Sequence, residues 1–437
     1  MITNQEFNNR RNQLMSLMPN NSIAILSAAP EKSRNRDVFY PYRQDSDFFY
    51  LTGFLEPEAV IVLIPGKNNH KYLMFCRDRN IEKETWDGRR VGPKGAKLKY
   101  GADDAFPIEK IDQILPKILE DRGKIYCSVG KNLTFDTLLT GYVKEKRGNA
   151  GSTSSTSGLF TNLDPLLHEM RLFKSLAEQK IMQEAAAISA YAHCRAMKNC
   201  VPGMYEYQLQ AEIEYEFTMA GAPSPAYGTI VGGGDNGCIL HYVENNSKLK
   251  DGDLVLIDAG CELQNYSADI TRTFPINGKF TAEQKMVYDI VLAAQVAGIA
   301  ACSTSNRWDQ PHNITVEIIT QGLLDLGIIQ GNLSELIEKK IYDKFYMHRA
   351  GHWLGMDVHD VGNYKINEQW RTFQPGMVTT IEPGIYISPD NKDVDRRWRG
   401  IGIRIEDDVL VTEDAPTVLS SDAPKTTIEI EAMMASK

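Results

Sequence analysis

Four carboxylates occupy matching places in two similar segments of the sequence. GDLVLIDAG and GMVTTIEPG share a glycine at each end and an Ile-acid pair before the last two residues, the acid being Asp258 in the first and Glu382 in the second. A further strand-like segment with one more acid follows each, with Asp269 in YSADITRTF and Glu406 in GIRIEDDVLV. This echo predicts two related β-hairpins with one carboxylate on each strand, the pattern expected from duplication of a half-domain.

The position of these acids within apolar segments indicates that they are buried. By the alternation of side chains along a strand, Asp258 points the same way as Leu254 and Leu256. Burying an ionised carboxylate without a partner costs several kcal/mol, and four such groups cannot all stay ionised without strong positive charge between them. We therefore infer a pair of divalent metal ions. Glu406 shares its face with Arg404, which is expected to orient it by a charge-assisted hydrogen bond.

Histidines gather in one short segment, HRAGHWLGMDVHD. It holds His348, His352 and His359 in a chain with only eight histidines. Gly351 and Gly355 in the same segment allow the backbone to approach closely, which is typical of a ligand-bearing turn. Oxygen-rich ligation with a single imidazole favours Mn²⁺, with Co²⁺ or Fe²⁺ also accommodated, over structural zinc, which prefers sulfur and nitrogen ligands.

The elements that position these residues change in character along the chain. Strand-like segments alternate with helical ones in the first third, which predicts an α/β N-terminal domain over residues 1–165. Its helices are expected at 108–121, interrupted at Pro116, and at 135–146. The small-residue run 148–158 is interpreted as a surface loop or linker before the domain boundary.

The remainder, residues 166–437, is predicted to be an α+β domain with an internally duplicated antiparallel sheet. Pro202 and Gly203 end a long first helix, and Val, Ile and Thr enrich the strands. The expected helices are at 175–200, 205–220, 282–301 and 309–326, and the expected strands at 253–261, 266–274, 377–387 and 401–411.

Composition narrows the class of protein. With 437 residues, 42% hydrophobic and 24% charged, the chain is long and apolar enough for a full-sized core. A net charge of −9 disfavours nucleic acid and anionic membrane surfaces as partners. There is no apolar run near membrane-spanning length and no signal-peptide pattern, and seven scattered cysteines lack a CxxC pair, so we expect a cytoplasmic protein.

The chemistry-bearing motifs resemble a known family. DAG at Asp258, DITRTF at Asp269, HWLGMDVHD from His352, EPG at Glu382 and GIRIEDD around Glu406 are similar, in order and spacing, to the five-ligand signature of the creatinase/aminopeptidase or "pita-bread" metallopeptidases. RNRDVFYPYRQDSDFFYLTGF, ETWDGRRVG, EMRLFKS and NGCILHY resemble bacterial members of the proline-specific branch. The likeness covers essentially the whole chain and implies the pita-bread fold for the C-terminal domain.

The resemblance also implies a ligand set and a reaction. Asp258 would bind one metal ion, His352 and Glu382 the other, and Asp269 and Glu406 would bridge the two, which are most often Mn²⁺ but also Co²⁺, Fe²⁺ or Zn²⁺. A hydroxide shared by the metals would attack the scissile carbonyl, with Glu382 as the general base. The implied activity is removal of the N-terminal residue from Xaa-Pro peptides.

Further roles follow from the resemblance alone. His359 and His241 would hydrogen-bond the substrate carbonyl and the developing oxyanion. A pocket for the proline ring would be shaped by His348, Tyr227 and Tyr386. In the N-terminal domain, Trp86 and Asp37 would reach the active-site mouth of a neighbouring subunit in a homotetramer, a dimer of dimers.

The alternatives are other members of the same family, of which a methionine aminopeptidase is disfavoured because that branch usually lacks a long N-terminal α/β domain. A prolidase has the same fold and metals but requires the free carboxylate of a dipeptide, and the N-terminal likeness favours the aminopeptidase. A scaffold without catalysis, or a metal-free amidinohydrolase, would have lost ligands that this chain keeps. The segment 363–374 departs from the bacterial pattern, and Arg371 within it is the candidate for an arginine expected near the site.

Overall fold

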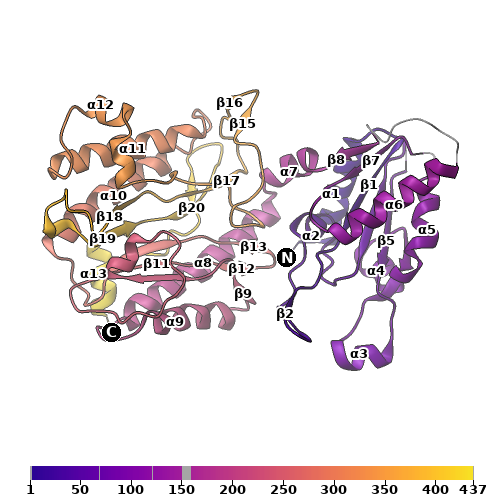
Figure 1. The fold of residues 1–437 in the computed structure, drawn as a ribbon, viewed down its shortest axis with the longest axis horizontal. Coiled ribbons are helices and arrows are strands. Elements are labelled where there is room, and N and C mark those ends of the chain that lie inside the picture. The colour runs from indigo at the N-terminus through magenta and orange to yellow at the C-terminus, as the bar shows by residue number, and fades with distance from the viewer. Residues whose placement is uncertain (1, 68, 121, 150–158, 437) are drawn as a thin grey trace. The chain divides into compact units, whose positions relative to one another are not determined.

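The computed structural model describes residues 2–67, 69–120, 122–149 and 159–436, which fall into two compact units, Ile2–Met170 and Arg171–Lys437 (Figure 1). The boundary predicted after residue 165 falls at the beginning of helix α7 (Asp164–Leu172), and the division between the units falls near its end. The predicted linker lies outside the described residues from position 150 on. None of the helices described is both long enough and apolar enough to cross a membrane.

The N-terminal unit is built on a six-stranded mixed sheet in the order β6-β5-β4-β1-β7-β8. Strand β1 pairs antiparallel with β4 and parallel with β7, which confirms an α/β domain. Its strands are β1 (Ser22–Ser27), β2 (Ser33–Asn35), β3 (Val38–Phe39), β4 (Val60–Ile64), β5 (Lys71–Cys76), β6 (Asp104–Pro107), β7 (Lys124–Cys127) and β8 (Phe160–Asn162). Its helices are α1 (Asn4–Ser16), α2 (Ser46–Thr52), α3 (Ile81–Asp87), α4 (Gly92–Tyr100), α5 (Ile111–Ile118) and α6 (Leu133–Asn149), followed by α7.

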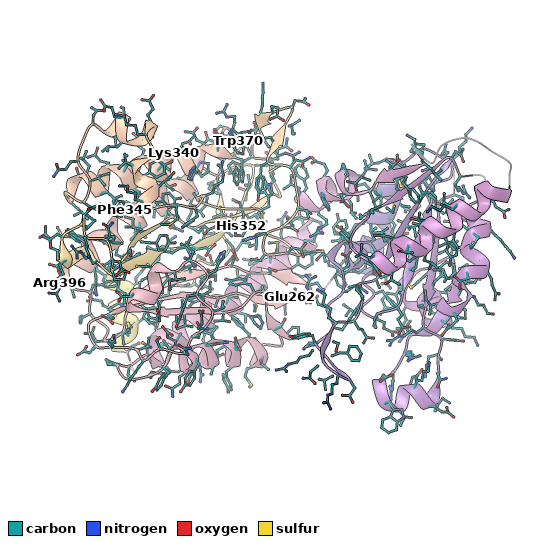
Figure 2. The ribbon with its side chains drawn as sticks, in the orientation of Figure 1. Glu262, Lys340, Phe345, His352, Trp370 and Arg396 are labelled. Carbon is teal, nitrogen blue, oxygen red and sulfur yellow. The ribbon has the colours of Figure 1, made fainter. Side chains whose placement is uncertain are left out.

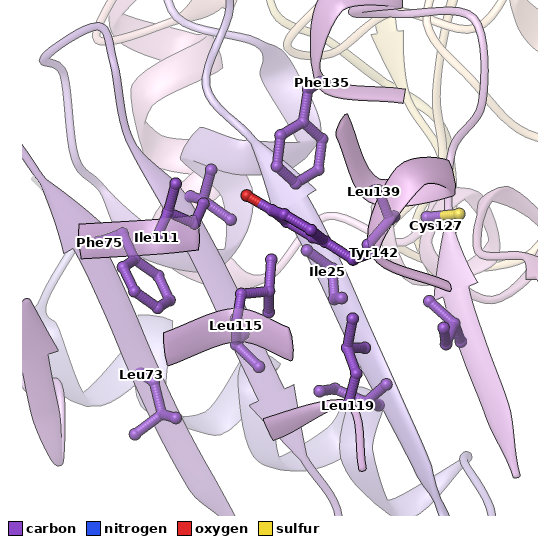
Figure 3. Packing of buried hydrophobic residues seen from close by; sticks show 14 of the residues in the cluster. Ile25, Leu73, Phe75, Ile111, Leu115, Leu119, Cys127, Phe135, Leu139 and Tyr142 are labelled. Carbon is purple, nitrogen blue, oxygen red and sulfur yellow. The ribbon is translucent and has the colours of Figure 1, made fainter. Parts of the chain in front are cut away.

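Helices α5 and α6 cover one face of this sheet. Leu115 of α5 and Leu139 of α6 pack with Ile25 and Phe75 of the strands in one apolar cluster (Figure 3). The prediction that Pro116 interrupts the first of these helices was wrong, because α5 continues through it to Ile118. A proline removes only one backbone donor, and here it does so within the last turn.

The C-terminal unit places its strands between two pairs of helices. In Figure 1, α8 (Leu176–Asn199) and α9 (Glu206–Met219) lie on one side of the strands, and α10 (Ala282–Ala300) and α11 (Asp309–Asp325) lie on the other. Ser175 caps α8 in a reciprocal bond pair with Glu178, and Cys200 is its C-cap, so the helix agrees with the predicted range 175–200. The unit is completed by α12 (Leu333–Glu338) and α13 (Thr427–Ala435).

Each of the four long strands expected around the acids is interrupted. The predicted strand 253–261 is split into β11 (Leu254–Asp258) and β12 (Cys261–Leu263), and its partner into β13 (Tyr266–Ser267) and β14 (Thr271–Pro275). The second hairpin is split in the same way. Its pieces are β17 (Val378–Ile381), β18 (Gly384–Ile387), β19 (Ile401–Arg404) and β20 (Asp407–Leu410). The pairings β11·β14, β12·β13, β17·β20 and β18·β19 are all antiparallel, which confirms the duplicated antiparallel sheet.

Cross-links between the hairpins explain these breaks. At the breaks, Glu406 N–H donates to the Thr271 carbonyl over 3.1 Å, and Asp269 N–H donates to the Asp408 carboxyl over 3.2 Å. Backbone groups that would bond within a continuous ladder therefore bond to the opposite hairpin and hold the two hairpins together. The acids predicted from the echo lie at the ends of strands or within the breaks, as a consequence of this arrangement.

A buried cation ties the second hairpin to the C-terminal segment. Arg272 is fully buried and donates to the carbonyl of Glu406, to the carboxylate of Asp407 over 2.7 Å and to the carbonyl of Ala423. Lys425 also pairs with Asp407, over 2.6 Å. Burial alone would raise the pKa of Asp407, but the two cations hold it below its ordinary value.

We expect Arg272→Met to lower the free energy of unfolding of the C-terminal unit by about 3 kcal/mol, because Asp407 keeps only one cation. Urea unfolding followed by tryptophan fluorescence measures this, since four of the five tryptophans lie in that unit. Lys279→Met is the control: its ion pair with Glu431 is exposed, and the expected change is under about 0.5 kcal/mol. Equal effects of both substitutions would contradict a structural role for the buried pair.

Candidate metal centre

The predicted ligands line one cavity of about 640 Å³ in the C-terminal unit. All five are present in its wall, namely Asp258, Asp269, His352, Glu382 and Glu406. The same wall contains the other predicted site residues of this unit except Tyr386: Tyr227, His241, His348, His359 and Arg404. Sequence positions that span residues 227 to 406 are therefore brought to one place.

The ligand atoms approach closely enough to share ions. Asp269, His352 and Glu406 each offer an atom within 4.8 Å of the others. His352 Nε2 lies 3.3 Å from Asp269 Oδ2 and 3.7 Å from Glu382 Oε1. Asp258 joins this group through the hydroxyl of Tyr227, which is 2.6 Å from Asp258 Oδ1 and 2.5 Å from Asp269 Oδ1.

The histidine is aimed by its own loop, which Figure 2 places beside the strands. His352 Nδ1 lies 3.0 Å from the Trp353 carbonyl, which can only accept, so Nδ1 donates to it and Nε2 faces the carboxylates. Thr380 N–H donates to the His352 carbonyl over 2.9 Å. The close approach requires Gly351, because a Cβ there would lie 2.0 Å from the Thr380 carbonyl oxygen.

Charge in this cluster is strongly unbalanced. Burial raises the pKa of Glu382 to about 7, and burial together with the nearby carboxylates raises the pKa of Glu406 well above its ordinary value. Burial would lower the pKa of His352, but hydrogen bonding and charge from Asp269 and Glu382 raise it to about 9. Four carboxylates and one imidazole with Arg404 as the cation form a donor set that fits divalent metal ions.

Arg404 contacts a different acid from the one expected. Its Nη2 donates to Asp258 Oδ2 over 2.6 Å, and its Nη1 donates to the Tyr386 hydroxyl over 3.0 Å. Its Nε donates to the hydroxyl of Thr271, which itself donates to Glu406 Oε2 over 2.6 Å. The predicted link to Glu406 is therefore indirect, because the guanidinium spans the gap between the hairpins and reaches β11.

Two exposed imidazoles face the cavity without a protein partner. Within the described residues, neither His241 nor His359 forms a hydrogen bond, so their ring nitrogens are available to a ligand. His348 differs, because its Nε2 lies 2.9 Å from the Tyr386 hydroxyl and its Nδ1 lies 2.8 Å from the Arg349 carbonyl. His348 and Tyr386 thus support one another at the edge of the cavity.

A buried ion cluster that sequence reasoning missed supports the His359 loop. Asp360 pairs with Arg171 and with Lys174, whose Nζ is 3.0 Å away. Burial alone would raise the pKa of Asp360, but these two cations hold it below its ordinary value. Arg171 and Lys174 belong to the motif EMRLFKS, which the sequence analysis singled out. The sequence alone did not indicate that the two cations pair with Asp360.

Other predicted residues lie elsewhere. Trp86 on α3 and Asp37 between β2 and β3 belong to the N-terminal unit, and both are exposed. The segment 363–374 forms the small hairpin of β15 (Lys365–Ile366) and β16 (Gln369–Trp370). Arg371 does not line the cavity and instead bonds through its backbone to the Tyr364 carbonyl.

The cavity is lined by four carboxylates, the imidazole of His352 and the rings of His241 and His359, on a duplicated antiparallel scaffold. This combination defines the class of metal-dependent hydrolases. Comparison with known proteins narrows the class. The metallopeptidase family M24 model matches residues 180–413, and the aminopeptidase P N-terminal domain model matches residues 7–126. The chain belongs to metallopeptidase family M24.

Relatives resemble the chain over its whole length. It is 45% identical to the Xaa-Pro aminopeptidase of Escherichia coli, over 99% of this chain and 98% of that protein, and 44% identical to the Haemophilus influenzae protein of that name over the same shares. Among solved structures, the Pseudomonas aeruginosa aminopeptidase PepP matches 100% of this chain and 98% of its own, with a TM-score of 0.97 and 54% identity. E. coli aminopeptidase P with the inhibitor Pro-Leu matches 100% and 99%, with a TM-score of 0.96 and 45% identity.

Proposed function

We propose that the cavity holds two divalent metal ions, most often Mn²⁺. Asp258 would bind one ion, His352 and Glu382 the other, and Asp269 and Glu406 both. The observation that carries this assignment is the set of four acids around one inward imidazole, which leaves more negative charge than Arg404 can neutralise. Carboxylate-rich sites favour manganese over structural zinc.

The protein is an Xaa-Pro aminopeptidase, a metal-dependent hydrolase that removes the N-terminal residue from peptides with proline in second position. Two relatives of that name are 44–45% identical to this chain over nearly its full length. When bound, two neighbouring divalent ions polarise a carbonyl and lower the pKa of a shared water.

The remaining steps belong to the protein's own side chains. Glu382 takes the proton of the attacking water and returns it to the leaving nitrogen of proline, a role that the position of its carboxylate in the cavity wall supports. His359 and His241 donate to the carbonyl oxygen as it gains charge, because their rings line the cavity and neither forms a hydrogen bond to another described residue. Tyr227, His348 and Tyr386 shape the pocket for the proline ring.

The N-terminal unit would close the active-site mouth of a neighbouring subunit in a cytoplasmic homotetramer. This part of the proposal is supported by the exposure of large apolar side chains on α3, where Trp86 is 88% exposed and Ile81 is 84% exposed. Exposed apolar groups that cluster on one element are typical of contact surfaces. Asp37 would contribute to the same boundary.

The test compares Xaa-Pro-Yaa and Xaa-Pro substrates with added Mn²⁺ and after chelation. We expect cleavage of the tripeptide at least as fast as that of the dipeptide, loss of activity with chelator, and recovery when Mn²⁺ returns. Release of the first residue, measured by chromatography, gives both rates. Cleavage of the dipeptide alone would identify a prolidase, and cleavage of neither by a metal-loaded protein would favour a scaffold without catalysis.

A further inference from the structure

The break between β11 and β12 is held by side chains of helix α8. The break leaves Ala259 and Gly260 outside the two strands, and Cys261 is the first residue of β12. The Ala259 carbonyl and the Cys261 N–H find their partners on α8. His193 Nε2 lies 3.0 Å from the Ala259 carbonyl oxygen, and the Ser189 hydroxyl accepts the Cys261 N–H over 3.0 Å. Both side chains are fully buried, one helical turn apart.

The histidine acts here as a neutral donor. Its burial lowers its pKa to about 4, so at neutral pH the ring carries one proton. A carbonyl oxygen can only accept, and the proton therefore resides on Nε2. The ring forms one directed hydrogen bond, to the carbonyl of the residue that follows Asp258. An apolar side chain could fill the same buried space without any polar atom that needs a partner.

Ala259 connects the two aspartates of the first hairpin. Its carbonyl is held by His193, and its N–H donates to the Ile270 carbonyl over 3.0 Å. Ile270 directly follows Asp269, and Tyr227 contacts both aspartate carboxylates. The Ala259 N–H belongs to the peptide plane that follows Asp258, and the Ala259 carbonyl belongs to the next plane. The two bonds therefore hold the backbone on both sides of Ala259 and limit how the chain can turn after Asp258.

The geometry points to His193, assisted by Ser189, as a positioning residue for the metal centre. We propose that its hydrogen bond to Ala259 holds Asp258 in the orientation that binds metal. The inference rests on the proposed metal centre. Helix α8 contributes no ligand, yet two of its side chains would help to orient one. Residues behind the ligands commonly have this role in metal sites.

The experiment measures Mn²⁺ binding by His193→Leu, His193→Gln and Thr320→Val. Leucine keeps the buried volume and loses the donor, whereas glutamine offers an amide N–H with a similar reach. Thr320 is a buried residue on α11 whose hydroxyl donates to the Val316 carbonyl and to no other described residue, so its replacement removes a hydrogen bond away from the site. Free Mn²⁺ measured by electron paramagnetic resonance gives the stoichiometry and the half-saturating concentration, and thermal unfolding without metal reports on the scaffold.

For His193→Leu we expect the half-saturating Mn²⁺ concentration of one of two ions to rise on the order of tenfold. The glutamine variant should stay within about threefold of the wild type, which is the rescue that a donor role requires, and Thr320→Val should leave the metal curve unchanged even if it unfolds earlier. If His193→Leu does not fold, Ser189→Ala provides the same test with a smaller cavity, and it too should weaken one ion.

Two results would overturn the inference. One is an unshifted metal curve for His193→Leu, or for Ser189→Ala in its place. The other is a shift in His193→Gln or in Thr320→Val as large as that in His193→Leu, which would mark a general loss of packing. A wild-type protein that binds no Mn²⁺ would contradict the proposed metal centre itself, so the two failures are distinguishable.

Discussion

Asp269→Ala and Glu406→Ala are each expected to abolish metal binding and to lower hydrolysis of an Xaa-Pro-Yaa peptide by at least about 10³-fold. The proposed centre assigns these two carboxylates to both ions, so removing either one disrupts the whole set. Two metal ions contribute several kcal/mol of transition-state stabilisation, and each 1.36 kcal/mol corresponds to a factor of ten in rate. Metal content by plasma emission spectroscopy and the initial rate of residue release measure the two effects.

Both variants should remain folded. Asp269 lies among other buried acids whose pKa values are raised by burial and by one another, so the loss of one carboxylate relieves repulsion in the metal-free protein. Thermal unfolding without metal is therefore expected at a temperature equal to or above that of the wild type. Asp289→Ala is the matched control, since this carboxylate on α10 is exposed and pairs only with Lys285 among the described residues. Full activity of Asp269→Ala after chelation would show that the bridging assignment is wrong.

His359→Ala is expected to keep both metal ions and to lose kcat by about 10²- to 10³-fold with little change in KM. The ring of His359 lies 4.3 Å from that of His352, centroid to centroid, and faces the cavity, but it has no place in the proposed ligand set. Removing one preorganised donor to a developing oxyanion has effects of this size. Steady-state kinetics at saturating Mn²⁺, together with the metal content, separate the two roles.

A histidine remote from the cavity provides the comparison. His70 belongs to the N-terminal unit and contacts the Gly66 backbone, so His70→Ala should leave kcat unchanged. Loss of metal from His359→Ala would make His359 a ligand instead of a donor. An unaltered kcat would remove it from the reaction.

Local patterns in the sequence were enough to predict the elements and the burial of the acids. The range of α8 was predicted to within one residue at each end, because the Pro-Gly pair that follows it is a local stop signal. Strand alternation placed Asp258 inward, and the structure buries it. The echo between the two hairpins was sufficient to predict the duplicated sheet.

The partners of these residues required the tertiary structure. The strand breaks exist because Glu406 and Asp269 bond to the opposite hairpin, and no pattern within one strand reports that contact. For the same reason Arg404 was assigned to the acid two positions away, whereas its guanidinium reaches Asp258 on another strand. The clusters around Arg272 and Asp360 join segments more than a hundred residues apart.

The interrupted strands also bear on how such an architecture changes over evolutionary time. The side chains that would do the chemistry lie at the end of a strand or between two strands, where the regular ladder of hydrogen bonds stops. Helix α8 and the opposite hairpin form hydrogen bonds with the neighbouring backbone groups. A substitution of Asp258 or Glu382 therefore alters the reaction while the scaffold retains its hydrogen bonds. Descendants of this fold can abandon hydrolysis and take up recognition, or acquire another reaction, through a few exchanges of side chains and without a new framework.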